Sequence, residues 1–189
     1  EIEAIRQTCD QHQLTLHLDG ARLFNALIAT RENPKNIGRL FHSISICLNK
    51  GLGCPMGSLL IGTKPFIRQA RRIRKLMGGG LRQAGFMAAT GVYALEHHVQ
   101  RLEEDHRHAR EIAGVIEKQS YCGKLYPVET NIILFETALP NQASTLIRKL
   151  EEKGIKAIAL SQQLVRMVLY LNITPEMVTT TIKAVQSIY

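Results

Sequence analysis

The stretch SISICLNKGLGCPMGSLLIG, residues 43–62, contains one lysine between two apolar runs and four glycines. Residues 43–49 alternate like a strand, and residues 57–62 form a second short apolar run bounded by glycines. Lys50 stands directly before Gly51, where the backbone can approach a ligand closely. A lysine in such a place can act as a nucleophile that forms a Schiff base, although an ordinary surface turn explains the same residues.

A carboxylate at the end of a second predicted strand favours the Schiff-base role of Lys50 over a surface turn. The segment LTLHLDGA, residues 14–21, predicts a buried strand that ends at Asp19, followed by the helical RLFNALIAT. Asp19 alone is better explained as a helix cap. However, ligand groups gather at the carboxyl ends of strands in α/β sheets. A lysine and a carboxylate at neighbouring strand ends form the pair that pyridoxal phosphate (PLP) requires, because one forms the imine and the other pairs with the pyridinium nitrogen.

The rest of the chain alternates helical and strand-like segments. A long helix is predicted from Pro65 to the triple glycine at 78–80, and a second one over residues 82–119. After residue 120 the predicted order is strand, helix, strand and helix, at residues 130–137, 141–154, 164–171 and 174–189. This order suggests a second, smaller α+β unit.

The net charge of +8 raises the question of a nucleic-acid partner, and residues 67–83 are the densest basic run. Such a partner would bind in a salt-dependent way through Arg68, Arg71, Arg72 and Arg74. Aromatic residues make up only 5% of the chain, tryptophan is absent, and no RNA-binding or zinc-finger signature occurs. A basic run at helical spacing is usually a solvated face, so the sequence predicts no nucleic-acid partner.

Two further patterns limit the class of protein. No apolar run reaches the roughly 18 residues that span a bilayer, and the first residues do not resemble a signal peptide. We therefore expect a cytoplasmic protein without a membrane partner. The histidine-rich stretch EHHVQRLEEDHRHAR, residues 96–110, lacks H-E-x-x-H spacing and is expected to be an exposed helix face. No metal site is predicted.

Three separated motifs carry a family resemblance: HLDGARLFNA at 17–26, the stretch at 43–62, and RKLMGGGLRQAGFMAATGVYALE at 74–96. In this order they resemble the threonine aldolases, within the β-eliminating lyase group of the fold-type-I PLP enzymes. The resemblance implies an α/β, aspartate-aminotransferase-like fold. Residues 1–98 would be the C-terminal part of the large PLP-binding domain, and residues 99–189 a small α+β C-terminal domain. The chain would then be the C-terminal part of a larger enzyme, without a complete site of its own.

The resemblance also implies a role for five residues. Lys50 would hold the cofactor as a Schiff base, and Asp19 would bind the pyridine nitrogen. Arg22 would lie near the cofactor and, with Arg166, bind the substrate carboxylate, for which an arginine fork is well suited. Arg82 would bind the phosphate or hold a subunit interface.

The implied activity is the PLP-dependent cleavage of threonine or allo-threonine to glycine and an aldehyde, which belongs to threonine catabolism and glycine biosynthesis. Elimination or transamination would use the same lysine and aspartate, so these reactions remain alternatives. A nucleic-acid-binding or scaffold protein is a third. The resemblance further implies a homo-oligomer, a dimer or tetramer. The preference between threonine and allo-threonine is not readable from these residues.

Overall fold

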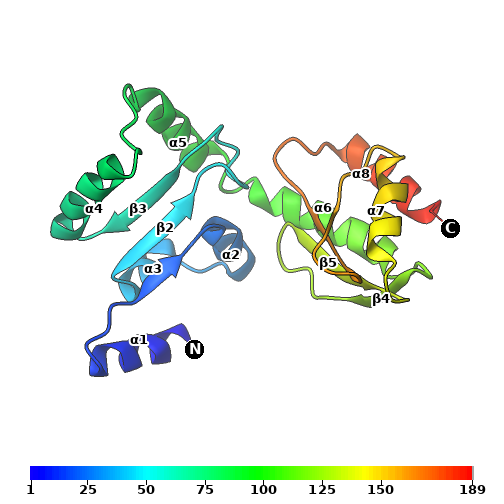
Figure 1. The fold of residues 1–189 in the computed structure, drawn as a ribbon, viewed down its shortest axis with the longest axis horizontal. Coiled ribbons are helices and arrows are strands. Elements are labelled where there is room, and N and C mark those ends of the chain that lie inside the picture. The colour runs from blue at the N-terminus through cyan, green and yellow to red at the C-terminus, as the bar shows by residue number, and fades with distance from the viewer. Residues whose placement is uncertain (189) are drawn as a thin grey trace. The chain divides into compact units, whose positions relative to one another are not determined.

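The computed structural model describes residues 1–188, which form two compact units. The first comprises Glu1–Gln100 and the second begins at Arg101. Figure 1 shows their helices and strands in chain order. The assignment of these units to parts of a large and a small domain, with a boundary after residue 98, stays a prediction.

The first unit is built on a three-stranded sheet with the order β1-β2-β3. Its strands are β1 (His17–Asp19), β2 (Ser43–Cys47) and β3 (Ser58–Gly62). β1 and β2 are parallel, with Asp19 aligned to Ser45, whereas β3 runs antiparallel to β2. The parallel pair brings the ends of β1 and β2, and the loops that follow them, to one edge of the sheet.

The expected buried strand at 14–21 is much shorter in the structure. β1 covers three residues with an exposed, half-buried, exposed pattern, and Leu14 is 58% exposed. β1 has only β2 as a neighbour, so its other side is not covered. β2 lies between two strands and shows the regular alternation, with Ile44 and Ile46 buried. The prediction of a buried strand is therefore wrong for most of residues 14–21.

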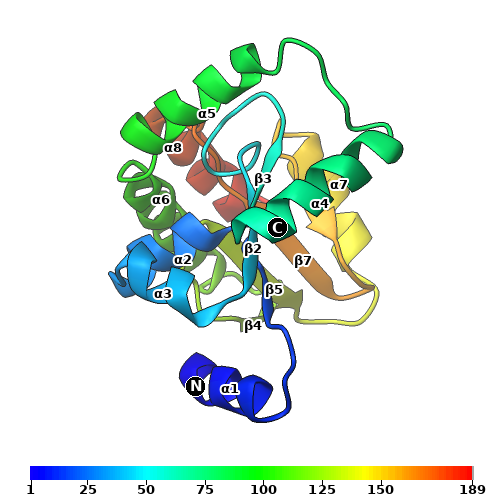
Figure 2. The same ribbon diagram turned by 90° about the vertical axis from the view of Figure 1, so that its left-hand side faces the viewer.

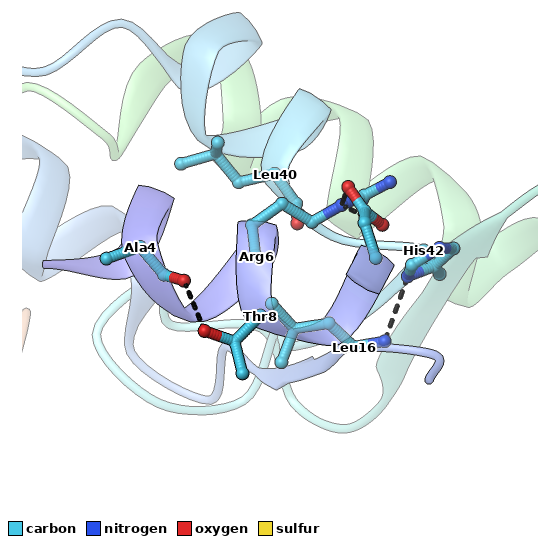
Figure 3. A network of polar contacts seen from close by, with 7 residues as sticks. Ala4, Arg6, Thr8, Leu16, Leu40 and His42 are labelled. Carbon is cyan, nitrogen blue, oxygen red and sulfur yellow. Dashed lines mark hydrogen bonds and ion pairs between the residues drawn. The ribbon is translucent and has the colours of Figure 1, made fainter. Parts of the chain in front are cut away.

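Helix α1 (Ile2–Gln11) is attached to α3 (Pro34–Leu40) through one side chain. Arg6 forms an ion pair with Asp10 at 2.9 Å and donates from Nη1 to the carbonyl oxygen of Leu40 at 3.1 Å (Figure 3). The two helices are thereby held next to the start of β2.

The helical part of the first unit continues with α2 (Leu23–Thr30), α4 (Lys64–Leu76) and α5 (Gly85–His97). As predicted, α4 ends just before the triple glycine, and an irregular segment leads to α5 (Figure 2). The single helix expected over 82–119 is wrong, because the chain turns between His97 and Leu102. At this point the His98 ring nitrogen Nδ1 lies 2.7 Å from the carbonyl oxygen of Leu52.

The second unit has a four-stranded antiparallel sheet with the order β4-β5-β7-β6. Its elements, in chain order, are α6 (Leu102–Ile116), β4 (Cys122–Leu125), β5 (Ile132–Thr137), α7 (Ala143–Glu151), β6 (Ile158–Ala159), β7 (Leu164–Val168) and α8 (Pro175–Gln186). The strand, helix, strand and helix predicted after residue 120 are confirmed. The short strands β4 and β6 were not predicted.

The core of the second unit lies between one face of this sheet and the helices. Strands β5 and β7 alternate, so that Ile133, Phe135 and Val165 are buried while Leu134 and Arg166 lie on the opposite face. The helices contribute Ile116, Leu146 and Val185 to the same cluster.

Helix α6 corrects the expectation of an exposed histidine-rich face. Asp105, His106 and His108 are each at most 2% exposed. They are buried because α6 packs against α8 and β5, with apolar residues at helical spacing on the same side.

Among residues 1–188 no group of three or more histidine, cysteine or carboxylate side chains is placed to hold a metal ion. None of the described helices has the length and apolar composition to cross a bilayer.

Burial of His106 makes stability depend on pH. Desolvation, assisted by the positive charge of Arg110, lowers the pKa of His106 from its usual 6.5, against an opposing effect of Glu103. A lowered pKa means that the stability is present above pH 6.5 and is lost as the pH falls towards the folded-state value. We expect urea unfolding midpoints to decrease between about pH 7.5 and pH 5.5. His106→Gln should flatten this decrease; an equally steep decrease in the variant would contradict the assignment.

Candidate active site

The turn after β1 exposes the carboxylate of Asp19 at the sheet edge. Its Oδ1 accepts a hydrogen bond from the Ala21 N–H at 3.1 Å. Gly20 donates to the carbonyl oxygen of Ser45 at 2.8 Å, and a Cβ at position 20 would lie 2.7 Å from the same oxygen. Glycine is therefore required for the turn, which fixes Asp19 beside β2 and leaves its Oδ2 available to a ligand.

Arg22 follows directly and has a buried nitrogen that lacks an acceptor. Its Nε is buried and has no hydrogen-bond partner among the described residues. The residue lines a narrow crevice together with Cys47 and Gly51, which belong to β2 and to the loop after it. Because a buried donor of a charged group normally has an acceptor, this position fits the oxygen of an anionic group.

Lys50 lies in a loop that its neighbours hold in place. Leu48 and Leu52, on either side, are 5% and 3% exposed, whereas Lys50 itself is half-buried. The Gly53 N–H donates to the Lys50 carbonyl at 2.9 Å, and Gly53 has a φ of 72°, which favours glycine. The Lys50 backbone is thereby fixed in the loop that follows β2.

The stretch of sequence that carries this loop contains only positive charges. No aspartate or glutamate occurs between Glu32 and Glu96, a segment that contains ten lysines and arginines. None of these ten forms an ion pair among the described residues. The segment that carries Lys50 therefore favours anionic ligands.

Helix α5 and His98, which directly follows it, form contacts with the Lys50 loop. The Cys54 thiol donates to the carbonyl oxygen of Thr90 at 3.5 Å, and His98 contacts the Leu52 carbonyl. A cavity of about 370 Å³ between the loop and the helix is lined by Tyr93 and His98, among others. Sequence reasoning missed this role of His98. The signal in the sequence is weak, because Glu96 and His97 separate His98 from the apolar run at 91–95.

The structure thus brings three of the five predicted site residues to one edge of the first sheet: Asp19, Arg22 and the Lys50 loop. Arg82 lies on an exposed turn before α5 and does not line either described cavity. Arg166 belongs to β7 of the second unit, where it is aligned with Leu134 and Ile158. The roles of all five remain predictions.

Solved structures with the same arrangement of elements define the class of fold. A putative aromatic amino acid β-eliminating lyase/threonine aldolase from Exiguobacterium sp. 255-15 superposes with a TM-score of 0.82 over 100% of this chain and 56% of its own, at 22% identity. An N-acetylornithine aminotransferase from Stenotrophomonas maltophilia reaches 0.68 over 97% of this chain and 49% of its own, at 19% identity. The chain has the α/β fold of the fold-type-I PLP enzymes, which confirms the predicted fold class.

The chain belongs to the β-eliminating lyase family, which it matches over residues 1–139. A probable low-specificity L-threonine aldolase of Arabidopsis thaliana is 38% identical over 178 residues, which are 92% of this chain and 50% of the relative. The low specificity L-threonine aldolase of Escherichia coli K12 is 39% identical over 166 residues, 88% of this chain and 48% of the relative. The chain spans about half the length of these relatives, and the predicted family resemblance is confirmed.

Proposed function

We propose that the protein containing this chain cleaves β-hydroxy-α-amino acids, threonine or allo-threonine, to glycine and an aldehyde with PLP as cofactor. The observation that carries the proposal is the convergence of Asp19, Arg22 and the Lys50 loop at one sheet edge in a chain of this family. The relatives named as threonine aldolases support the choice of reaction.

The residues present fit the cofactor. Lys50, a half-buried residue in a segment without carboxylates, is suited to bind an aldehyde covalently through its amine. The free oxygen of Asp19 is suited to accept a hydrogen bond from a protonated ring nitrogen and to keep that proton in place. When bound, PLP supplies an electron sink for the bond that breaks at the substrate Cα.

Two arginines are proposed to orient the substrate. Arg22 has a buried Nε that needs an acceptor, which a substrate carboxylate oxygen supplies. Arg166 stands on the face of the second sheet opposite its apolar core and would provide the other half of the carboxylate clamp. A carboxylate bound by guanidinium groups fixes the orientation of the substrate Cα–Cβ bond. Arg82 is proposed to bind the cofactor phosphate or to hold a subunit interface.

The remaining expectations belong to the same proposal. The protein is proposed to associate into a dimer or tetramer. The protein works in the cytoplasm on amino acids, in threonine catabolism that yields glycine, and has no nucleic-acid or membrane partner.

Product analysis tests the reaction. The complete protein is incubated with PLP and L-threonine, and we expect equal amounts of glycine and acetaldehyde. Elimination would instead give 2-oxobutyrate with ammonia, and transamination would require an oxo-acid acceptor. Formation of 2-oxobutyrate with ammonia, or turnover that depends on an added oxo acid, would replace aldol cleavage with the corresponding alternative.

A further inference from the structure

The end of strand β7 is held by a buried amide from the start of β5. Asn131 is fully buried, and its Nδ2 donates to the carbonyl oxygen of Leu169 at 2.7 Å. In return the Leu169 N–H donates to the Asn131 carbonyl at 2.9 Å. The backbone bond continues the β5–β7 ladder one residue beyond its last strand pair, Ile132 and Val168, and the side-chain amide adds a second bond at the same position.

A second, partly buried contact reaches the same segment from the start of α6. Arg101 donates from Nη2 to the carbonyl oxygen of Leu171 at 3.0 Å, and its Nη1 lies 2.9 Å from Oδ1 of Asp105. Asp105 is fully buried, and Arg101 is the one described residue within ion-pair distance of it. One guanidinium therefore joins the first turn of α6 to the chain that leaves β7.

The register of β7 decides which face of the sheet Arg166 occupies, because side chains alternate between the two faces along the strand. Val165 and Met167 face the core, and Arg166 lies on the opposite face. A slip by one residue would exchange the two faces and bury Arg166. On one side β7 pairs with β5 over five residues, but on the other β6 spans only two residues. The short β6 contributes little to fixing the register.

We propose that Asn131 and the Arg101–Asp105 ion pair lock the register of β7 and thereby position Arg166 for the substrate carboxylate. The lock is a property of the second unit alone, whereas the role of Arg166 rests on the proposed function. Buried polar and ionic groups that exclude alternative registers are known from coiled coils. Arg101, Asp105 and Asn131 are positioning residues in this proposal, because they act through the strand that carries Arg166.

Hydrogen exchange in the complete protein tests the lock without reference to any activity. Arg101→Met removes the contacts of the guanidinium with Leu171 and Asp105, together with a longer one to the exposed Glu104. Arg107→Met is the matched control, since Arg107 lies on the same helix and contacts Glu111 and His108 rather than the chain that leaves β7. We expect faster exchange confined to residues 164–171 in Arg101→Met and parental rates in the control. Unchanged exchange, or an equal increase throughout the second unit, would overturn the lock.

Steady-state kinetics with L-threonine test the positioning of Arg166. In Arg101→Met we expect the KM to rise about tenfold and kcat to change less than about threefold, since a carboxylate contact is lost rather than the bond-breaking machinery. Arg101→Lys keeps a charge beside Asp105, so its KM should rise less than that of Arg101→Met, with kcat again little changed. This variant replaces Arg101→Met in the test if Arg101→Met does not fold. A KM equal to that of Arg107→Met overturns the positioning. If the parent protein cleaves neither L-threonine nor L-allo-threonine, the proposed function is refuted instead, and hydrogen exchange still decides the lock.

Discussion

Replacing Lys50 by alanine is expected to lower the kcat/KM of the complete protein for L-threonine by at least about 10³-fold. Lys50 is the amine proposed to hold PLP, and no other lysine lies between Lys35 and Lys64. The Lys50→Ala protein should also lose the covalent label that borohydride leaves when it reduces the complex of the parent protein with PLP. Mass mapping of the labelled peptide measures this directly.

Lys75→Ala is the matched control for this experiment. Lys75 lies in the last turn of α4, is exposed, and belongs to the same segment without carboxylates. Its replacement removes the same charge and should leave the kcat/KM within about twofold of the parent. A retained label and retained activity in Lys50→Ala would refute the assignment of Lys50.

The second large effect concerns stability. Phe135→Ala should lower the free energy of unfolding by about 3–5 kcal/mol, because it opens a cavity in the core of the second unit. Phe135 is 1% exposed and its ring centroid lies 6.5 Å from that of Tyr121. Urea unfolding followed by tyrosine fluorescence measures the change.

The neighbouring Leu134 gives the comparison for Phe135. It lies on the same strand with its side chain on the opposite, half-buried face. We expect Leu134→Ala to lower the free energy of unfolding by only about 1 kcal/mol. Equal losses in the two variants would show that the two faces of β5 are equally packed, contrary to the alternation in the structure.

The sequence predicted those elements that carry a regular apolar alternation or a helix cap within their own residues. The alternating run at 43–47 and the capped helix that begins after Thr174 are examples, and the Thr174 hydroxyl does accept from the Met177 N–H. Strand β6 escaped prediction because two residues carry no periodicity. The break between α5 and α6 was missed because no glycine or proline marks residues 98–101.

The candidate site was predictable only in part from the sequence. Asp19 and Lys50 could be found because each follows a strand-like run and stands next to a glycine. The burial of Asp105 was not predicted, since a charged residue in a charged stretch suggests a solvated face, and only the packing of α6 against α8 and β5 encloses it. The placement of Arg166 depends on the register of a strand in the second unit, which spacing along the chain does not determine.

The segment between Glu32 and Glu96 also bears on how fast a ligand arrives. Ten cationic side chains without a carboxylate among them contribute a net positive charge to the first unit. A small anion diffusing towards the first unit is attracted before it makes any contact, so its capture rate exceeds that of a neutral molecule of the same size. Because mobile ions screen this attraction over about 10 Å at 0.1 M salt, the capture rate falls as salt is added.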